Sequence, residues 1–207
     1  MSTITGHTGL TALLGSPVAH SISPLMHNEA FRLLELDYVY LCFDVNEETL
    51  PAAVAGLRTC GIRGFNLTMP NKNKIVELLD ELSPEAQLIG AVNTVLNDNG
   101  KLIGYNTDGY GFMQSVRDAG HDVTNKNITV MGVGGASMAI CAQSALDGAS
   151  SVHIFARRTS RYWNRTQKFA ENLTAKTGCQ VCLFDNDDHT ALKDSIAQSY
   201  LLINATS

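Results

Sequence analysis

The stretch NITVMGVGGASMAICAQSALDGA, residues 127–149, decides the fold. Its apolar run ITVM predicts a buried strand, and the segment that begins near Ala136 predicts a helix. Glycines between the two allow a tight turn and a close backbone approach, and the N-terminus of the helix offers N–H groups to an anion. Strand, glycine turn and helix in this order are typical of a dinucleotide-binding site.

We expect the pyrophosphate of a dinucleotide to lie against the turn itself. The residues of this predicted site are Gly132, Val133, Gly134, Gly135 and Ala136. The spacing departs from the usual G-x-G-x-x-G, because Met138 stands where the third glycine would be. The alternative is a glycine-rich turn that only packs a strand against a helix.

The end of the next predicted strand, SVHIFARR at residues 151–158, bears on the choice of cofactor. A site selective for NAD usually places Asp or Glu there, to bind the ribose hydroxyls. This chain has Ala156, Arg157, Arg158 and Thr159 instead. Two arginines suit a 2′-phosphate, so NADP is favoured over NAD, although NAD stays open. The alternative is a basic strand end that is simply solvated.

Short apolar runs alternate with segments of helical period along the whole chain, which indicates the α/β class. We expect an N-terminal α/β domain at residues 1–113 and a Rossmann-like nucleotide domain at 114–207. Residues 71–82, NKNKIVELLDEL, predict a helix, and residues 91–108 predict a hairpin that turns at Asn99-Gly100.

The last apolar run, YLLIN at residues 200–204, stands close to the end of the sequence at Ser207. A doubly wound sheet normally continues with another helix and more strands. Either the nucleotide domain is minimal or its C-terminal part is missing, and we favour the second interpretation.

Composition excludes several classes of partner. A net charge of -5 argues against nucleic acid, because phosphate backbones need clustered Lys and Arg. No run approaches the roughly 20 apolar residues that span a bilayer, so we expect no membrane partner. Five scattered cysteines fit a reducing compartment, which favours the cytoplasm. Six histidines without metal-ligand spacing indicate no metal site.

Polar residues follow the predicted strands of the first region. They are Ser21, Ser23, Asn66, Thr68, Asn93, Thr94, Thr107 and Asp108. Strand-end loops build the binding crevices of open α/β sheets, and hydroxyl and amide groups suit a ligand that bears many hydroxyls. Each residue alone is as well explained as a helix cap or a turn former.

Six motifs occur together and in one order: GSPVAHSISPLMHNEAF, GFNLTMPNK, GAVNTV, GYNTDGYGF, VGGAS and INATS. In this combination the chain resembles the shikimate dehydrogenase family from Leu13 onward. The resemblance implies substrate binding by Ser21, Ser23, Asn66, Thr68 and Asn93. It implies Lys72 and Asp108 as the catalytic pair, and it adds Thr206 to the cofactor-binding residues.

The resemblance implies the reversible, NADP(H)-dependent reduction of 3-dehydroshikimate to shikimate, a step toward the aromatic amino acids. Lys72 would exchange a proton with the substrate oxygen, and Asp108 would hold its amine in position. The motifs are most similar to the quinate/shikimate branch, which also oxidises quinate. Ala156 and Thr159 replace an Asn and an Asp of that branch, and the loss of the Asp weakens the case for NAD.

Two alternatives remain open. One is a truncated, non-catalytic relative that binds a ligand. The other is a different Rossmann dehydrogenase, such as one that acts on folates. This alternative leaves unexplained the loop with Ser21 and Ser23, the serine loop, and the NTDG motif at residues 106–109. The oligomeric state is expected to be a monomer or a homodimer.

Overall fold

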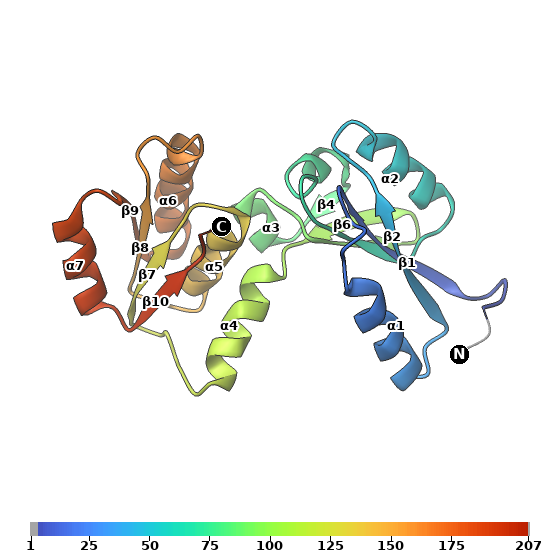
Figure 1. Cartoon of the computed structure of the whole chain (residues 1–207), viewed down its shortest axis with the longest axis horizontal. Coiled ribbons are helices and arrows are strands. Elements are labelled where there is room, and N and C mark those ends of the chain that lie inside the picture. Colours follow the sequence, from blue (N-terminus) through green and yellow to red (C-terminus); the bar gives the residue numbers. More distant parts are fainter. Residues whose placement is uncertain (1–3, 207) are drawn as a thin grey trace. The chain divides into compact units, whose positions relative to one another are not determined.

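The computed structural model describes residues 4–206 and divides the chain into two compact units, Met1–Asn106 and Thr107–Ser207 (Figure 1). The division falls a few residues before the boundary expected from the sequence, between 113 and 114. The reason is that α4 (Asp108–Asp118) packs along α5 (Gly135–Leu146) and so belongs to unit 2.

Unit 1 is a mixed sheet with helices on both faces. In chain order its elements are β1 (Gly9–Gly15), α1 (Ser23–Leu33), β2 (Tyr38–Asp44), α2 (Leu50–Thr59), β3 (Gly64–Leu67), the 3₁₀ helix η1 (Lys74–Leu78), β4 (Glu81–Leu82), α3 (Pro84–Ile89), β5 (Thr94–Asp98) and β6 (Lys101–Tyr105).

The strand order of unit 1, β2-β1-β3-β5-β6-β4, determines which loops meet. Strand β1 is parallel to both β2 and β3, so the carboxyl ends of these three strands share one edge of the sheet. Strand β5 runs antiparallel to β3, which sets its first residue, Thr94, opposite Asn66. The start of β5 therefore lies at the same edge as the end of β3.

The two faces of this sheet are covered unequally. On one face Leu14 packs with Leu50 and Val54 of α2 and with Ile75 of η1 in a fully buried core. Each such side chain stabilises the unit by about 1.5–3 kcal/mol. On the other face a small cluster around Leu13, Val18 and Tyr40 is covered by Phe31 of α1, a helix that buries none of its residues completely.

The hairpin expected at residues 91–108 is confirmed: β5 and β6 pair antiparallel, and the turn residues Asn99 and Gly100 have φ of 51° and 93°. The helix expected at 71–82 is wrong. Only Lys74–Leu78 is helical, as a 3₁₀ turn, and Glu81–Leu82 is strand β4, which pairs with β6. Pairing with β6 overrides the helix-forming composition of this segment.

Unit 2 is an open parallel sheet. After α4 its elements are β7 (Asn127–Met131), α5, β8 (Ser151–Ala156), α6 (Trp163–Thr177), β9 (Gln180–Asp185), α7 (His189–Gln198) and β10 (Leu201–Asn204). All strands run parallel in the order β10-β7-β8-β9, so the direction of winding reverses at β7. Helix α7 covers one face of the sheet, opposite α5 and α6 (Figure 1). The expected α/β class and the Rossmann-like second half are confirmed.

A chain of buried hydroxyls ties α7 to this sheet. Thr129 Oγ1 on β7 lies 2.6 Å from both Ser195 Oγ and Ser199 Oγ, and Ser195 Oγ lies 2.8 Å from His153 Nδ1 on β8. The His153 ring also contacts Phe184 edge-on. Since buried polar groups are costly unless paired, this network favours a single position for α7.

His153 gives unit 2 a testable dependence on pH. Burial lowers the pKa of its imidazole below the ordinary value of 6.5. The unfolded chain then binds the proton more readily, so the contribution of His153 to stability is complete above pH 6.5 and is lost as the pH falls through the lower folded-state pKa. We expect the unfolding free energy from urea titrations to fall less for His153→Asn than for the wild type between about pH 7.5 and about pH 5. Equal losses in the two proteins would contradict this.

Candidate active site

In unit 1 the expected substrate residues gather at the shared carboxyl edge of β1 and β3. The loops that follow these strands approach closely, because Ser16 N–H donates to the Met69 carbonyl at 2.9 Å and Thr68 N–H to the Leu14 carbonyl at 3.0 Å. A side chain at Gly15 would lie 2.2 Å from Thr68 Cγ2. Glycine at this position therefore permits the contact between the serine loop and the Thr68 loop.

Asn66, Thr68 and Asn93 come together through the pairing of β3 with the start of β5. Leu67 N–H donates to the Asn93 carbonyl at 2.8 Å, and Asn66 Nδ2 donates to the same oxygen at 3.2 Å. Thr94 Oγ1 donates to Asn93 Oδ1 at 3.0 Å. The three expected residues thus lie within two adjacent strand ends, as the sequence predicts for a binding crevice.

Ser21 lies in the loop between β1 and α1, and Ser23 is the first residue of α1. Ser21 Oγ accepts from Ser23 N–H at 3.2 Å, and both residues are half-buried. Helix α1 begins at Ser23, and its cap residue, Ile22, makes no side-chain capping hydrogen bond. Because helix N-termini attract anions, the serine hydroxyls and the first turn of α1 form a polar end suited to a carboxylate.

Lys72 is fixed through its backbone. Its carbonyl accepts from Val92 N–H at 2.8 Å, next to Asn93. The preceding residue, Asn71, is fully buried, and its Nδ2 donates to the Val45 carbonyl at 2.7 Å. These bonds hold the loop after β3 against the start of β5, so the Lys72 backbone lies at the edge that carries the other expected residues.

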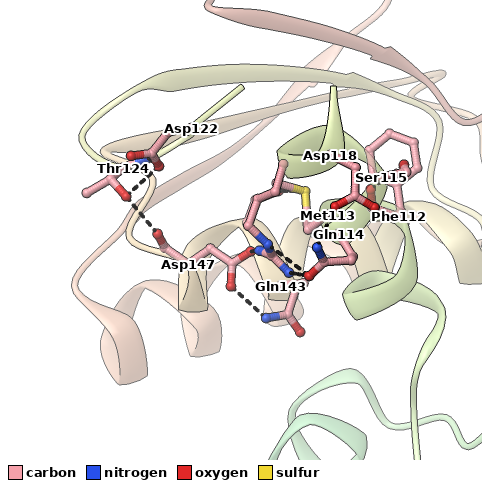
Figure 2. Close-up of polar contacts among 11 residues, drawn as sticks. Phe112, Met113, Gln114, Ser115, Asp118, Asp122, Thr124, Gln143 and Asp147 are labelled. Carbon is pink, nitrogen blue, oxygen red and sulfur yellow. Dashed lines mark hydrogen bonds and ion pairs between the residues drawn. The ribbon is translucent and has the colours of Figure 1, made fainter. Parts of the chain in front are cut away.

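Asp108 is the first residue of α4 in unit 2, and the packing of α4 determines its position there. A side chain at Gly109 would lie 2.2 Å from the Ala139 carbonyl of α5, so the two helices touch closely. At the far end of α4, Arg117 pairs with Asp147 at 2.7 Å, and Asp147 also accepts from Gln143 (Figure 2). Asp108 is therefore carried on a helix that is clamped to α5 at both ends.

The glycine turn lies between β7 and α5, as expected. Gly132 has φ of 107°, and a Cβ there would lie 2.7 Å from the Ala205 carbonyl after β10. Ser137 Oγ donates to the Gly132 carbonyl at 2.6 Å and closes the turn. Gly134 and Gly135 are exposed, and a Cβ on either would meet no atom within 4 Å. The first turn of α5 therefore offers open space beside helix N–H groups, which fits a pyrophosphate.

The expected nucleotide-end residues follow β8. Ala156 is buried, whereas Arg157, Arg158 and Thr159 are exposed. The Arg158 guanidinium lies 4.9 Å from the centre of the Trp163 ring at the start of α6. This contact holds one planar cation at the carboxyl end of β8, beside the glycine turn of the neighbouring strand.

Thr206 follows β10, the strand on the other side of β7. Its N–H and Oγ1 both donate to Asn204 Oδ1, at 3.1 and 2.7 Å. The ends of β7 and β10 flank the point where the winding of the sheet reverses, which is where open α/β sheets bind their ligands. Thr206 and the glycine turn therefore lie together at the carboxyl ends of β10 and β7, while Ser207 lies outside the described residues.

A small cavity of unit 2 lies elsewhere. It has a volume of about 180 Å³ and is bordered by Met113, Arg117, His121, Asp122 and Thr124. Thr124 Oγ1 bonds to Asp122 at 2.7 Å beside it (Figure 2). These residues precede β7, at the amino end of the strands, so the cavity is separate from the glycine turn and Thr206.

In residues 4–206 no group of three or more His, Cys, Asp or Glu is arranged to hold a metal ion. No helix in this range is long and apolar enough to cross a membrane.

Sequence reasoning did not assign Tyr40 to the site and named Thr94 only among the polar strand-end residues, yet both bond to Asn66. Tyr40 O–H donates to Asn66 Oδ1 at 2.8 Å, and Asn66 Nδ2 donates to Thr94 Oγ1 at 3.0 Å. Side chains alternate along β2, so Tyr38, Tyr40 and Cys42 share one face of the strand. This alternation is the one feature of the sequence that indicates the direction of the Tyr40 side chain. It does not reveal that the Tyr40 hydroxyl reaches past β1 to β3.

The fold and the two polar edges define a protein of the doubly wound α/β class, with a glycine turn at the switch point of its second sheet. Comparison with known proteins gives the family. Residues 13–95 match the shikimate dehydrogenase substrate binding domain. A shikimate dehydrogenase (NADP(+)) of Listeria innocua is 50% identical over 203 residues, which cover 98% of this chain and 69% of that protein. The chain belongs to the shikimate dehydrogenase family.

Other relatives agree. A Streptococcus pyogenes shikimate dehydrogenase (NADP(+)) is 50% identical, covering 99% of this chain and 70% of that protein. The crystal structure of shikimate 5-dehydrogenase from Listeria monocytogenes, in complex with shikimate and NAD, matches with a TM-score of 0.96 and 48% identity, over 100% of this chain and 71% of that one. Quinate dehydrogenase from Corynebacterium glutamicum, in complex with NAD, matches with a TM-score of 0.83 and 27% identity, over 96% and 71% of the two chains.

Proposed function

We propose that this protein is an NADP-dependent shikimate dehydrogenase, an oxidoreductase that interconverts 3-dehydroshikimate and shikimate. The observation that carries the proposal is the meeting of Asn66, Thr68, Asn93 and the Lys72 backbone at one sheet edge, in a chain 50% identical to enzymes of that name. Hydroxyl and amide groups at this edge suit a ligand with several hydroxyls.

Each unit supplies one part of the chemistry. In unit 1, Ser21 and Ser23 bind the substrate carboxylate, and Asn66, Thr68 and Asn93 bind its hydroxyls. In unit 2, the turn from Gly132 to Ala136 binds the pyrophosphate, together with Thr206 and the 156–159 segment at the nucleotide end. A bound NADP(H) supplies the hydride chemistry.

Lys72 carries the proton step. In the reduction direction its Nζ donates a proton to the oxygen on which negative charge develops, and in the oxidation direction it accepts that proton. Asp108, at the start of α4, is the second member of the catalytic pair. The remaining residues orient the substrate and exclude other geometries, which lowers the entropic part of the barrier.

The direct test is an absorbance assay of purified protein with shikimate and NADP+. Appearance of NADPH that depends on shikimate supports the proposal. Calorimetry distinguishes the alternative of a non-catalytic relative, because that protein binds shikimate without turnover. The same assay with quinate in place of shikimate measures the substrate specificity. We propose shikimate as the preferred substrate and quinate as a second one.

The arginines after β8 give a prediction on cofactor choice. We expect Arg157→Ala, combined with Arg158→Ala, to raise the KM for NADP+ by about 10- to 100-fold, because charge-assisted bonds to the 2′-phosphate are lost. The KM for NAD+ should stay within about twofold, since NAD+ has no 2′-phosphate. The exposed Lys168→Ala on α6 removes a positive charge elsewhere in unit 2 and serves as the control. Equal effects on both cofactors would argue against a 2′-phosphate site.

Two further assignments complete the proposal. We propose that the protein acts in the cytoplasm, because no membrane partner is predicted and its cysteines are scattered. Fractionation of cells tests this location. The quaternary state is proposed to be a monomer or a homodimer, which light scattering of the purified protein resolves.

A further inference from the structure

A directed chain of hydrogen bonds crosses the sheet of unit 1 and includes two of the expected substrate residues. It runs from Tyr40 on β2, past β1, to Asn66 on β3 and then to Thr94 at the start of β5. From Thr94 it continues to the side chain of Asn93. Two of its members, Asn66 and Asn93, are residues that the proposed function assigns to substrate binding.

The carbonyl of Asn93 fixes the direction of this chain. A carbonyl oxygen only accepts, so the group of Asn66 that faces it at 3.2 Å must be the NH₂ group. Asn66 Oδ1 then faces Tyr40, and the phenol must donate to it. The Asn66 NH₂ group has two protons, and they point to the Asn93 carbonyl and to Thr94 Oγ1.

The hydrogen bonds of Thr94 run in the same donor-to-acceptor direction. Its oxygen accepts from Asn66, so its single proton is available to Asn93 Oδ1 at 3.0 Å. The amide orientation of Asn93 therefore depends on that of Asn66. Since an amide that turns by 180° exchanges a donor for an acceptor, the chain determines what both residues present to a ligand.

Tyr40 is held firmly enough to serve as the start of the chain. It is 3% exposed, and its backbone N–H and carbonyl both bond to the side chain of Asn28 on α1, at 2.8 and 3.0 Å. The His27 ring stacks on the Tyr40 ring with centroids 4.2 Å apart. Burial raises the pKa of the Tyr40 phenol, so the group keeps its proton and remains a donor.

We propose that Tyr40 and Thr94 are positioning residues that fix the amides of Asn66 and Asn93, and that Asn66 therefore acts toward the ligand only as a hydrogen-bond acceptor. The remaining lone pair of Asn66 Oδ1 accepts from a ligand O–H. A ligand carboxylate or carbonyl has no proton to give, so this position selects a hydroxyl and rejects an oxidised or ionised group. The inference rests on the proposed function, and it adds which atoms of the site select a ligand hydroxyl.

The experiment compares Tyr40→Phe with Tyr38→Phe, which removes the same hydroxyl from the same face of β2. We expect Tyr40→Phe to lower kcat/KM for shikimate by about 5- to 20-fold, mostly through KM, and to leave the KM for NADP+ unchanged. Tyr38→Phe should stay within about twofold of the wild type. Thr94→Val should resemble Tyr40→Phe, and Thr94→Ser, which keeps the hydroxyl, should restore most of the activity.

A double variant separates positioning from a general loss of stability. If Tyr40 acts through Asn66, adding Tyr40→Phe to Asn66→Ala should change kcat/KM by less than about twofold. Independent, multiplying effects would overturn the inference, as would an unchanged kcat/KM in Tyr40→Phe or equal activities of Thr94→Val and Thr94→Ser. If Tyr40→Phe fails to fold, the Thr94 pair decides. Wild-type protein without shikimate turnover overturns the proposed function and this inference together, whereas an active wild type with unaffected variants overturns only the inference.

Discussion

Replacement of Lys72 by alanine is expected to lower kcat for shikimate oxidation by about 10²- to 10⁴-fold, the usual contribution of a positioned acid or base. The KM for NADP+ should change little, because the glycine turn and the arginines lie in unit 2 and are untouched. The measurement is steady-state kinetics with each substrate varied, together with calorimetry of NADP+ binding.

Lys74→Ala is the matched control for this variant. Lys74 lies two residues further on, and its Nζ forms a surface ion pair with Glu77 at 2.8 Å. Such exposed pairs contribute little, so the control should retain both fold and turnover. Lys72→Arg keeps the positive charge but holds its proton too tightly to transfer it, and should be almost as inactive as Lys72→Ala. Retention of wild-type kcat in Lys72→Ala would remove Lys72 from the mechanism.

The elements that the sequence predicted well are those in which local pattern and tertiary context agree. The 127–149 stretch folds as strand, glycine turn and helix, and the Asn99-Gly100 turn joins β5 to β6. In both places the residues satisfy a backbone requirement, positive φ, that hardly any other sequence meets as well. The loops that carry Ser21, Thr68 and Asn93 could be placed at strand ends because each adjoins an apolar run that reads as a strand.

The failures have equally specific causes. Residues 71–82 contain good helix formers, but Asn71 is drawn into the core and Leu102 N–H bonds to Asp80, so the segment becomes a 3₁₀ turn and a strand. Helix α3 at Pro84–Ile89 was not predicted, although Ser83 caps it by accepting from Ala86 N–H and Gly90 ends it with φ of 69°. Its six residues are too few for a visible period.

The role of Tyr40 could not be obtained from the sequence at all. It stands in YVYLCFDV, where an aromatic residue is fully explained by strand propensity and burial. Its bond to Asn66 spans 26 residues and depends on the order β2-β1-β3, which places the two strands on either side of β1. Side-chain networks between non-adjacent strands require the register, and the sequence does not supply it.

The glycine turn gives the last prediction, because its glycines are required for two different reasons. Gly132 has positive φ, and a Cβ there would lie 2.7 Å from the Ala205 carbonyl. We expect Gly132→Ala to lower the unfolding free energy of unit 2 by about 2–4 kcal/mol, the sum of backbone strain and overpacking. This loss should be present without any cofactor, and urea titration of the purified protein measures it.

Gly135 has no such structural requirement. It begins α5, and a Cβ there would meet no protein atom within 4 Å, so Gly135→Ala should leave stability unchanged or slightly improved. If the open space is where the pyrophosphate lies, the added methyl group should instead weaken NADP+ binding by about 10-fold or more, through lost backbone contacts. Calorimetry of NADP+ on both variants separates the cases. Unchanged stability in Gly132→Ala would show that the backbone of the turn accommodates a side chain at little cost in free energy. Unchanged NADP+ affinity in Gly135→Ala would show that the pyrophosphate does not bind at the first turn of α5.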